Sequence, residues 1–340
     1  RRMRGSAPGR VQIAGCTPHT PVVMARRRTP GKCRAGTVQR RFGHRASGQY
    51  TGALRPIPHG PTDRNARLNT PANVENPVPG MDLVAAQRWS QRAACESPWL
   101  HEEVGSRMAD RLPWFREPPT SWLHWEPLQG GLEVHRKLRS MLPGALCHVA
   151  ARRIPEVLAA TREAPERSWN PLQWGKSTGP TAATANTRVR MLWANMALHM
   201  ELQPQTLLAQ WHRQIETDGF LMFSCLGPDS LKELRAVYAA EGWPPPSHAF
   251  TDMHDWGDML VHAGFAEPVM DMERITLTFS TAAAMLKELR GLGHNLSDQR
   301  FGACRSRHWH ARLCAAIESG LPRSADGRLS LTFEIIYGHA

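Results

Sequence analysis

The stretch Thr120–Leu138, TSWLHWEPLQGGLEVHRKL, constrains the fold more than any other part of the sequence. It has a short apolar lead, a turn that contains the double glycine Gly130–Gly131, and then an amphipathic run. This is the layout of a strand, a loop and a helix at a nucleotide-binding site. The turn residues are unusual, because a loop that holds a small cofactor rarely has Trp-Glu-Pro-Leu-Gln before its glycines. Three interpretations are open at this point: a working cofactor loop, a loop that has lost its function, and an ordinary turn.

The segments after this stretch continue the alternation of strands and helices. The apolar run Ala145–Ala151 predicts a second strand, and residues 154–164 predict a helix. This β-α-β-α order favours a parallel sheet with helices on both faces. Residues 165–188 predict a loop. Their GKST sequence at 175–178 resembles the end of a phosphate-binding loop, but Asn170 stands where that motif requires glycine.

Two later apolar runs predict buried strands: residues 188–195, and residues 220–227, which are of the kind buried on both faces in a parallel sheet. Between them, residues 203–219 predict a helix whose apolar face includes Ile215 and which stops at Gly219. An earlier helix is expected after Ser97 as its cap and Pro98 as its first residue. Its apolar residues recur every four positions, at Leu100, Val104, Met108 and Leu112.

The C-terminal part predicts helices and two strands. Asp229 is expected to cap a helix that extends to residue 242. Further helices are expected at residues 255–264 and 281–293, and strands at residues 273–280 and 327–338. The last strand alternates apolar and polar residues, as in a strand with one dry face. Two late strands after a parallel core suggest an antiparallel hairpin or edge pair that closes the sheet.

Residues 1–80 differ in composition from the rest of the chain. They hold 15 of the 42 Lys and Arg residues but only two of the 30 acids, so residues 81–340 carry 27 basic and 28 acidic residues. The first 80 residues also hold ten Gly, ten Pro and no Trp, which predicts a disordered basic extension. An RNA-binding or targeting segment is the alternative that we considered. The helical pattern that begins at Met81 favours a simpler interpretation, in which translation starts there and the gene model is over-extended.

The seven cysteines are scattered and form no Cys-x-x-Cys pair, which argues against a disulfide framework or a zinc ribbon and favours a reducing cytoplasm. No apolar run approaches the roughly 20 residues that span a bilayer. We therefore expect a soluble, cytoplasmic protein that binds neither membrane nor nucleic acid. The sequence does not indicate an oligomeric state.

Four blocks in the C-terminal half carry a family resemblance: MLWANMALHM, DGFLMFSCLGPDSLKELR, FTDMHDWGDMLVHAGFAEPVMDMERITLTF and LTFEIIYGHA. They resemble the S-adenosylmethionine-dependent malonyl-[acyl-carrier protein] O-methyltransferases of biotin synthesis. The likeness is nearly continuous over Met191–Ala340 and weaker over residues 81–190. It implies an α/β, Rossmann-like class I methyltransferase domain at residues 81–340. Its mostly parallel seven-stranded sheet would have helices on both faces, a helical lid or insert at about 227–320, and a returning strand at 327–338.

The resemblance also implies a reaction, a cofactor and a partner. The methyl group of S-adenosyl-L-methionine would pass to the free carboxylate of a malonyl thioester on acyl carrier protein. A carboxylate is already a nucleophile, so alignment and exclusion of water should contribute most of the acceleration.

By position, the resemblance assigns cofactor binding to Glu126, Gly130 and Gly131, although the family's Asp-x-Gly-x-Gly pattern is altered here. The second strand ends in VAARR (149–153), which has no acid for the ribose hydroxyls. Glu96 stands where a tyrosine is expected to close over the cofactor. These departures leave a second hypothesis open: a non-catalytic homologue that binds the carrier protein as a partner or regulator.

The resemblance also suggests residues on the substrate side. Asn195 and His199 align with a block that lines the active site, so both are candidate catalytic residues and Asn195 is a candidate cofactor ligand. Arg235 and Arg274 are candidates for the substrate carboxylate or the acidic carrier protein. No metal is expected at the polar cluster formed by His248, Asp252, His254, Asp255, Asp258 and His262, which capping by Asp255 and an exposed helix face explain. Trp193 and Trp211 are expected to pack in the core.

Overall fold

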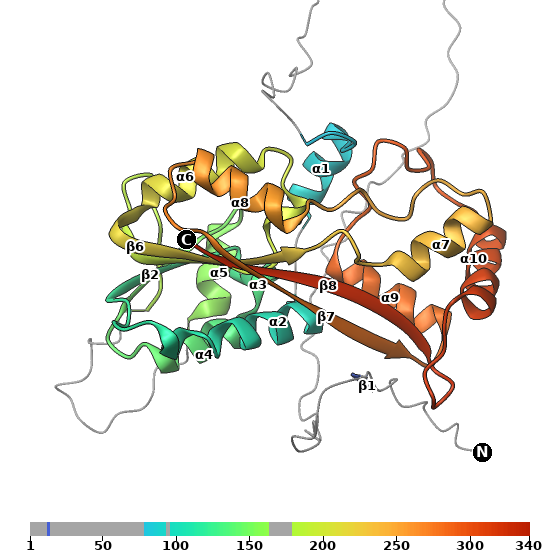
Figure 1. Ribbon diagram of the computed structural model, residues 1–340, viewed down its shortest axis with the longest axis horizontal. Coiled ribbons are helices and arrows are strands. Elements are labelled where there is room, and N and C mark those ends of the chain that lie inside the picture. Colours follow the sequence, from blue (N-terminus) through green and yellow to red (C-terminus); the bar gives the residue numbers. More distant parts are fainter. Residues whose placement is uncertain (1–11, 14–77, 93–95, 163–178) are drawn as a thin grey trace, which may run out of the picture. The chain divides into compact units, whose positions relative to one another are not determined.

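The computed structural model describes residues 12–13, 78–92, 96–162 and 179–340 (Figure 1). The predictions for most of residues 1–80 and for the GKST sequence at 175–178 therefore lie outside the described residues. The helix predicted to begin near Met81 is confirmed by α1 (Leu83–Ser90), which Asp82 caps by accepting a hydrogen bond from Ala85 N.

One mixed sheet organises the described chain. Its main strands are β2 (Ser121–Trp125), β3 (Leu146–Ala150), β4 (Thr181–Ala182), β5 (Val189–Ala194), β6 (Ile215–Leu226), β7 (Val269–Phe279) and β8 (Leu329–His339). Their spatial order is β7-β8-β6-β5-β2-β3-β4, and the two-residue β1 (Gln12–Ile13) pairs with β7. All seven main strands are parallel except β8, which is antiparallel to both β6 and β7. The predicted Rossmann-like, mostly parallel sheet is confirmed.

Helices cover both faces of this sheet. They are α2 (Trp99–Ala109), α3 (Pro127–Gly130), α4 (Leu132–Met141), α5 (Ile154–Thr161), α6 (Pro204–Gln214), α7 (Lys232–Ala240), α8 (Met253–His262), α9 (Ala282–Leu292) and α10 (Arg307–Gly320), with the 3-10 turns η1 (Leu112–Trp114) and η3 (Leu198–Met200). In Figure 1, α6 and α8 lie above the sheet and α2 and α4 below it. Trp193 belongs to the core on the α2 and α4 side, and Trp211 to the core on the α6 and α8 side. Both tryptophans are fully buried, which confirms their prediction.

The predicted helix 203–219 was wrong at its C-terminal end. Helix α6 ends at Gln214 and β6 begins at Ile215, which pairs with Val189. The register then shifts, since the next pair joins Met191 to Phe220. Gly219 lies in this irregular stretch, where an added Cβ would be only 2.9 Å from the main-chain oxygen of Arg190. Apolar spacing over so few residues fits the end of a helix and the start of a strand equally well.

Three predicted helix caps were also wrong. Leu231, with φ +60°, precedes α7 without a side-chain cap, and Asp229 instead pairs with Arg274. Helix α8 is capped by Asp252 and not by Asp255. Pro98 takes the cap position of α2, while the Ser97 hydroxyl contacts the start of α4.

The two late strands close the sheet as an antiparallel pair, which confirms that prediction. The single dry face predicted for the last strand holds only in its first half, because β8 lies between β6 and β7 and is buried on both faces from Phe333 to Tyr337. Leu112 falls in η1 and not in α2, but it is buried as its spacing indicates. In the part of the chain that the structure describes, no helix has the length and apolar character needed to cross a bilayer.

Candidate active site

The candidate site lies at the carboxyl ends of β2, β3 and β5. The chain leaves β2 towards β3 on one side, and β5 lies on the other side of β2, so the strand order reverses between β2 and β5. Open α/β sheets bind ligands in the crevice at such a switch point. The loop with the double glycine leaves β2 at this position and leads into α4.

This loop is a tight turn with two left-handed positions. Glu126 has φ +50°, residues 127–130 form the single helical turn α3, and Gly131 has φ +128°. A Cβ at Gly131 would lie 2.9 Å from Oε2 of Glu102, and one at Gly130 would lie 3.1 Å from the main-chain oxygen of Asn195. Glycine is therefore required at Gly131 by backbone conformation and by close packing.

The side chains of Glu102 in α2 and of Ser97 just before that helix occupy the N-terminus of α4. The Glu102 carboxylate accepts hydrogen bonds from the main-chain N–H groups of Glu133 (3.1 Å) and Val134 (2.9 Å). The Ser97 hydroxyl accepts one from Leu132 N at 3.1 Å. These three donors are the groups with which a helix N-terminus binds an anion. Because they are already used, an anionic ligand has to find its partners elsewhere in the site.

Asn195, one residue after β5, ties this loop to its neighbours. Its amide nitrogen donates to the main-chain oxygens of His101, at 2.7 Å, and Gly130, and its amide oxygen accepts from the Ser224 hydroxyl at 2.6 Å. The residue is 1% exposed, and both amide hydrogens are used. A ligand that accepts a hydrogen bond from this amide nitrogen would have to displace one of its two bonds.

A cleft of about 490 Å³ opens beside the loop. Small side chains at the ends of β3 and β4 form one wall, namely Ala150, Ala151, Ala183, Thr184 and Ala185. Glu126 and Glu201 contribute carboxylates to it. A smaller hollow shares Glu126, Arg152 and Glu201 with this cleft and extends to Asn195. The site therefore combines room for a flat ring with acceptors for hydroxyl groups.

The two carboxylates are held by Arg152. Its main-chain N–H donates to Glu126 Oε1 at 2.8 Å, and its guanidinium pairs with Glu201 at 3.1 Å. Burial raises the pKa of the Glu126 carboxyl, and the hydrogen bond from Arg152 opposes that shift. Glu201 is a residue of the cleft that was not predicted from the sequence. Its position two residues after His199, in the block that follows β5, was the available signal.

A third cleft, of about 260 Å³, adjoins the loop on the side of α1 and α9. Four arginines line it, Arg92, Arg152, Arg153 and Arg290, together with Trp89. Glu96, which stands where the resemblance expects a tyrosine, also lines this cleft. The predicted departures at Glu96 and at the two arginines after β3 thus lie together in space.

His199 lies in η3 among buried histidines. His248 Nε2 donates to the His199 main-chain oxygen at 2.7 Å, and His101 Nδ1 donates to the Gln129 oxygen at 2.8 Å. Burial holds the pKa of His199 well below its usual value, and it lowers the pKa of His101 to about 4. Nδ1 of His199 has no hydrogen-bond partner among the described residues. These rings are neutral at pH 7, so they can accept or donate a hydrogen bond but supply no charge.

Arg235 and Arg274 lie away from the cleft, and both have partners within the protein. Arg235 donates to the main-chain oxygens of Ser230 (2.8 Å) and Pro228 (2.6 Å). Arg274 pairs with Asp229 at 2.8 Å and lies 3.8 Å from Glu334. In the described ranges, His, Cys, Asp and Glu side chains form no group of three suited to hold a metal ion.

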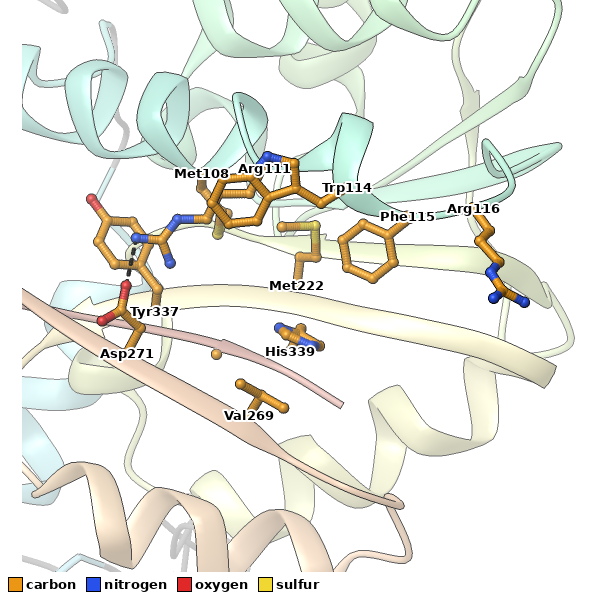
Figure 2. A pocket seen from close by; sticks show the side chains of 11 residues that line it. Met108, Arg111, Trp114, Phe115, Arg116, Met222, Val269, Asp271, Tyr337 and His339 are labelled. Atoms are coloured by element: carbon orange, nitrogen blue, oxygen red, sulfur yellow. Dashed lines mark hydrogen bonds and ion pairs between the residues drawn. The ribbon is translucent and has the colours of Figure 1, made fainter.

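Figure 2 shows another cleft, of about 450 Å³, between the C-terminal end of α2 and strands β6, β7 and β8. Arg111 crosses it to pair with Asp271 at 2.8 Å, and its guanidinium lies over the Tyr337 ring at 4.2 Å. None of the predicted site residues lines this cleft. It is distinct from the crevice at the carboxyl ends of the strands.

The strand order, the glycine turn after β2 and the cleft at the switch point are those of the Rossmann-like class I methyltransferase fold. The chain belongs to the malonyl-[acyl-carrier protein] O-methyltransferase family. It is 35% identical over 248 residues to the family member of Gallionella capsiferriformans, which covers 71% of this chain and 83% of that protein. It is 43% identical over 157 residues to the member of Laribacter hongkongensis, which covers 46% of this chain and 52% of that protein.

Several of these relatives are matched over only about half of their own length, as for those of Laribacter hongkongensis and Methylovorus. No family model matches the chain. Among solved structures, it is similar to a putative methyltransferase of Bacillus halodurans, with 12% identity, a TM-score of 0.42, and coverage of 70% of this chain and 97% of that one.

Proposed function

We propose that this protein transfers a methyl group from S-adenosylmethionine to the free carboxylate of a malonyl thioester on acyl carrier protein. The ester would mask a charge, so that chain-elongating enzymes accept the product as an apolar primer on the route to pimeloyl and biotin. The observation that carries the proposal is the cleft at the β2/β5 switch point, with Glu126 and Glu201 at one end and alanines along its wall. Membership of the family supplies the substrate class.

The residues of the cleft fit S-adenosylmethionine, although the acid expected at the end of β3 is absent. Ala150, Ala183 and Ala185 leave space for a purine between the ends of β3 and β4. Glu201 lines the same cleft, directly after η3. Its carboxylate can accept hydrogen bonds from the ribose hydroxyls in place of that acid. Glu126 is the second acceptor. When bound, S-adenosylmethionine supplies a methyl group on a positively charged sulfur, which is already a leaving group.

The chain's own residues orient the reactants and exclude water. A malonyl carboxylate is ionised at neutral pH, so no general base is needed to make it a nucleophile. Asn195 holds the glycine loop against the end of β5. Such positioning can contribute roughly 7–11 kcal/mol to lowering a bimolecular barrier.

The direct test is methyl transfer from methyl-labelled S-adenosylmethionine by the full chain, with malonyl-CoA and malonyl-[acyl-carrier protein] as acceptors. We expect a labelled methyl ester that forms on malonyl thioesters and not on acetyl thioesters, which lack the free carboxylate. Soluble, folded protein that labels neither acceptor would contradict the proposal and favour a non-catalytic homologue. Growth without biotin in a strain that lacks its own methyltransferase provides the corresponding test in cells.

A further inference from the structure

The segment that leads into α10 carries several basic residues and no acid. Residues 299–317 contain four arginines, two histidines and no acid, although residues 81–340 as a whole have a net charge of −1. Two of these arginines are paired, Arg300 with Asp82 at 2.9 Å and Arg312 with Glu241 at 3.1 Å. Arg305 and Arg307 form no ion pair with any residue that the structure describes. Two arginines without an ion pair in the described part of the chain therefore lie at the start of α10.

Two aromatic rings pack against the guanidinium of Arg305. The Arg305 guanidinium lies over the Phe301 ring at 4.4 Å and over the Trp309 ring at 3.8 Å. Trp309 in turn packs on Trp243, with ring centroids 5.6 Å apart. Phe301 is 50% exposed, so its ring is accessible to a partner. Arginine and aromatic side chains on a rigid base are the groups that contribute most to binding at protein interfaces.

The same segment connects this surface to the candidate active site. Arg290 and Gly291, at the end of α9, line the 260 Å³ cleft beside the glycine loop. The His294 ring then stacks on Trp89 of α1, with centroids 6.2 Å apart, and Ser297 forms a bridge with Met81. Residues 290–297 thus connect the cleft, along the chain, to the segment 301–310.

We propose that the surface formed by Phe301, Arg305, Arg307, His308 and His310, here called the α10 surface, docks the acidic carrier protein that presents the thioester. The proposal rests on the proposed function. Acyl carrier proteins are small and acidic, and their carboxylates complement this patch in charge. The nearly neutral charge of residues 81–340 disfavours a nucleic acid, which requires a longer basic track. Arg235 and Arg274 are less suited, because both already have partners within the fold.

The test compares wild-type full-length protein with the double variant Arg305→Glu/Arg307→Glu and with Arg213→Glu. Arg213 is an exposed arginine on α6, outside the α10 surface, and serves as the matched charge reversal. Glutamate at position 307 is compatible with folding, since this first residue of α10 follows the Ser306 cap, where a negative charge favours a helix. Circular dichroism and thermal unfolding would verify that all three proteins are folded.

The probe is fluorophore-labelled acyl carrier protein without its prosthetic arm, and the readout is fluorescence anisotropy. We expect the double variant to bind about tenfold more weakly than wild type and Arg213→Glu to bind as wild type does. Wild-type binding should weaken as salt increases, and more steeply than that of the double variant. Equal affinity of the wild type and the double variant, or no binding by wild type, would overturn the proposal.

A kinetic comparison separates this proposal from the proposed function. The KM for malonyl-[acyl-carrier protein] should rise in the double variant, while kinetics with malonyl-CoA, which has no protein to dock, should not change. An equal rise in both KM values would overturn the proposal, because it would place the arginines in the small-molecule site. Failure of wild type to methylate either malonyl thioester would count against the proposed function but leave the binding result intact.

Discussion

Asn195, at the carboxyl end of β5, donates a hydrogen bond from its side-chain amide to the main-chain oxygen of Gly130 in the loop after β2. The same amide nitrogen donates to His101 of α2. One side chain thus holds together the three segments that meet at the switch point of the sheet. A residue predicted to act in catalysis is placed, in the structure, to keep the loop in its shape.

Replacing Asn195 by alanine should lower the free energy of unfolding by about 2–4 kcal/mol, because it removes two hydrogen bonds to buried carbonyl oxygens and the one accepted from Ser224. Urea denaturation provides the measurement. Ser224→Ala is the matched control: it removes one hydrogen bond to Asn195 and should cost about 1 kcal/mol. Equal losses of unfolding free energy in the two variants would contradict the conclusion that Asn195 holds the three segments together.

Gly131→Ala should destabilise the protein more than Gly144→Ala. Both glycines have positive φ, +128° and +88°, but only at Gly131 would the new Cβ meet another side chain, Glu102 Oε2 at 2.9 Å. The backbone effect alone costs roughly 1 kcal/mol or more at either position. Thermal unfolding of the two variants isolates the packing contribution at the loop, and identical shifts would argue against it.

Glu102→Gln tests the occupied N-terminus of α4. The charged carboxylate accepts two main-chain hydrogen bonds there, so its loss should cost about 1–2 kcal/mol of stability. The neighbouring Glu103 forms only a half-exposed ion pair with Arg107, and Glu103→Gln should cost no more than about 0.5 kcal/mol. Urea denaturation near pH 7 would measure both variants. A smaller effect at Glu102 than at Glu103 would refute this assignment.

Several features of the fold could be predicted from the sequence because they depend on strong local patterns. The run around Phe223 is apolar on both faces, as a parallel strand in the middle of a sheet requires, and it became such a strand. The shorter apolar runs around Trp122, Val149 and Leu192 also became parallel strands. The start of β6 at Ile215 could not be predicted, because pairing with Val189 in another segment decides it.

The candidate site was predictable only in part. Gly131 indicated the loop by its residue type. The prediction that Asp229 caps a helix was wrong, because its ion pair with Arg274 joins residues far apart in sequence and local patterns do not contain it. The role of Asn195 depends on contacts with α2, β6 and the glycine loop, which local patterns do not contain. The position of Glu201 in the site likewise depends on its ion pair with Arg152, which lies 49 residues away in the chain. Long-range contacts of this kind have no signature in a single sequence.

Acid should destabilise the protein through its buried histidines. Burial lowers the pKa of His101 to about 4 and that of His135 to about 3, and the His135 ring forms a 3.0 Å hydrogen bond with His124. The pKa of an exposed histidine in the unfolded chain is about 6.5, so the unfolded state binds protons first as the pH falls. The contribution of these neutral rings to the free energy of unfolding should be fully present above pH 6.5. It should decrease towards pH 4 by on the order of 1 kcal/mol per pH unit for each histidine.

Urea denaturation at a series of pH values checks this dependence. His135→Gln removes one of the titrating groups, so its stability should depend less steeply on pH between 6 and 4 than that of wild type. A stability that does not change over this range would contradict the neutral, buried state of these rings.

The central claim is that the cleft beside Glu126 and Glu201 holds S-adenosylmethionine despite the altered loop. Calorimetric titration of the full chain with S-adenosylhomocysteine, the product of methyl transfer, tests this claim most directly. The account predicts saturable binding to wild type, binding weakened about tenfold or more by Glu201→Gln through the loss of charged hydrogen bonds, and binding abolished by Gly131→Val. Absence of heat with folded wild-type protein at high micromolar ligand would contradict it.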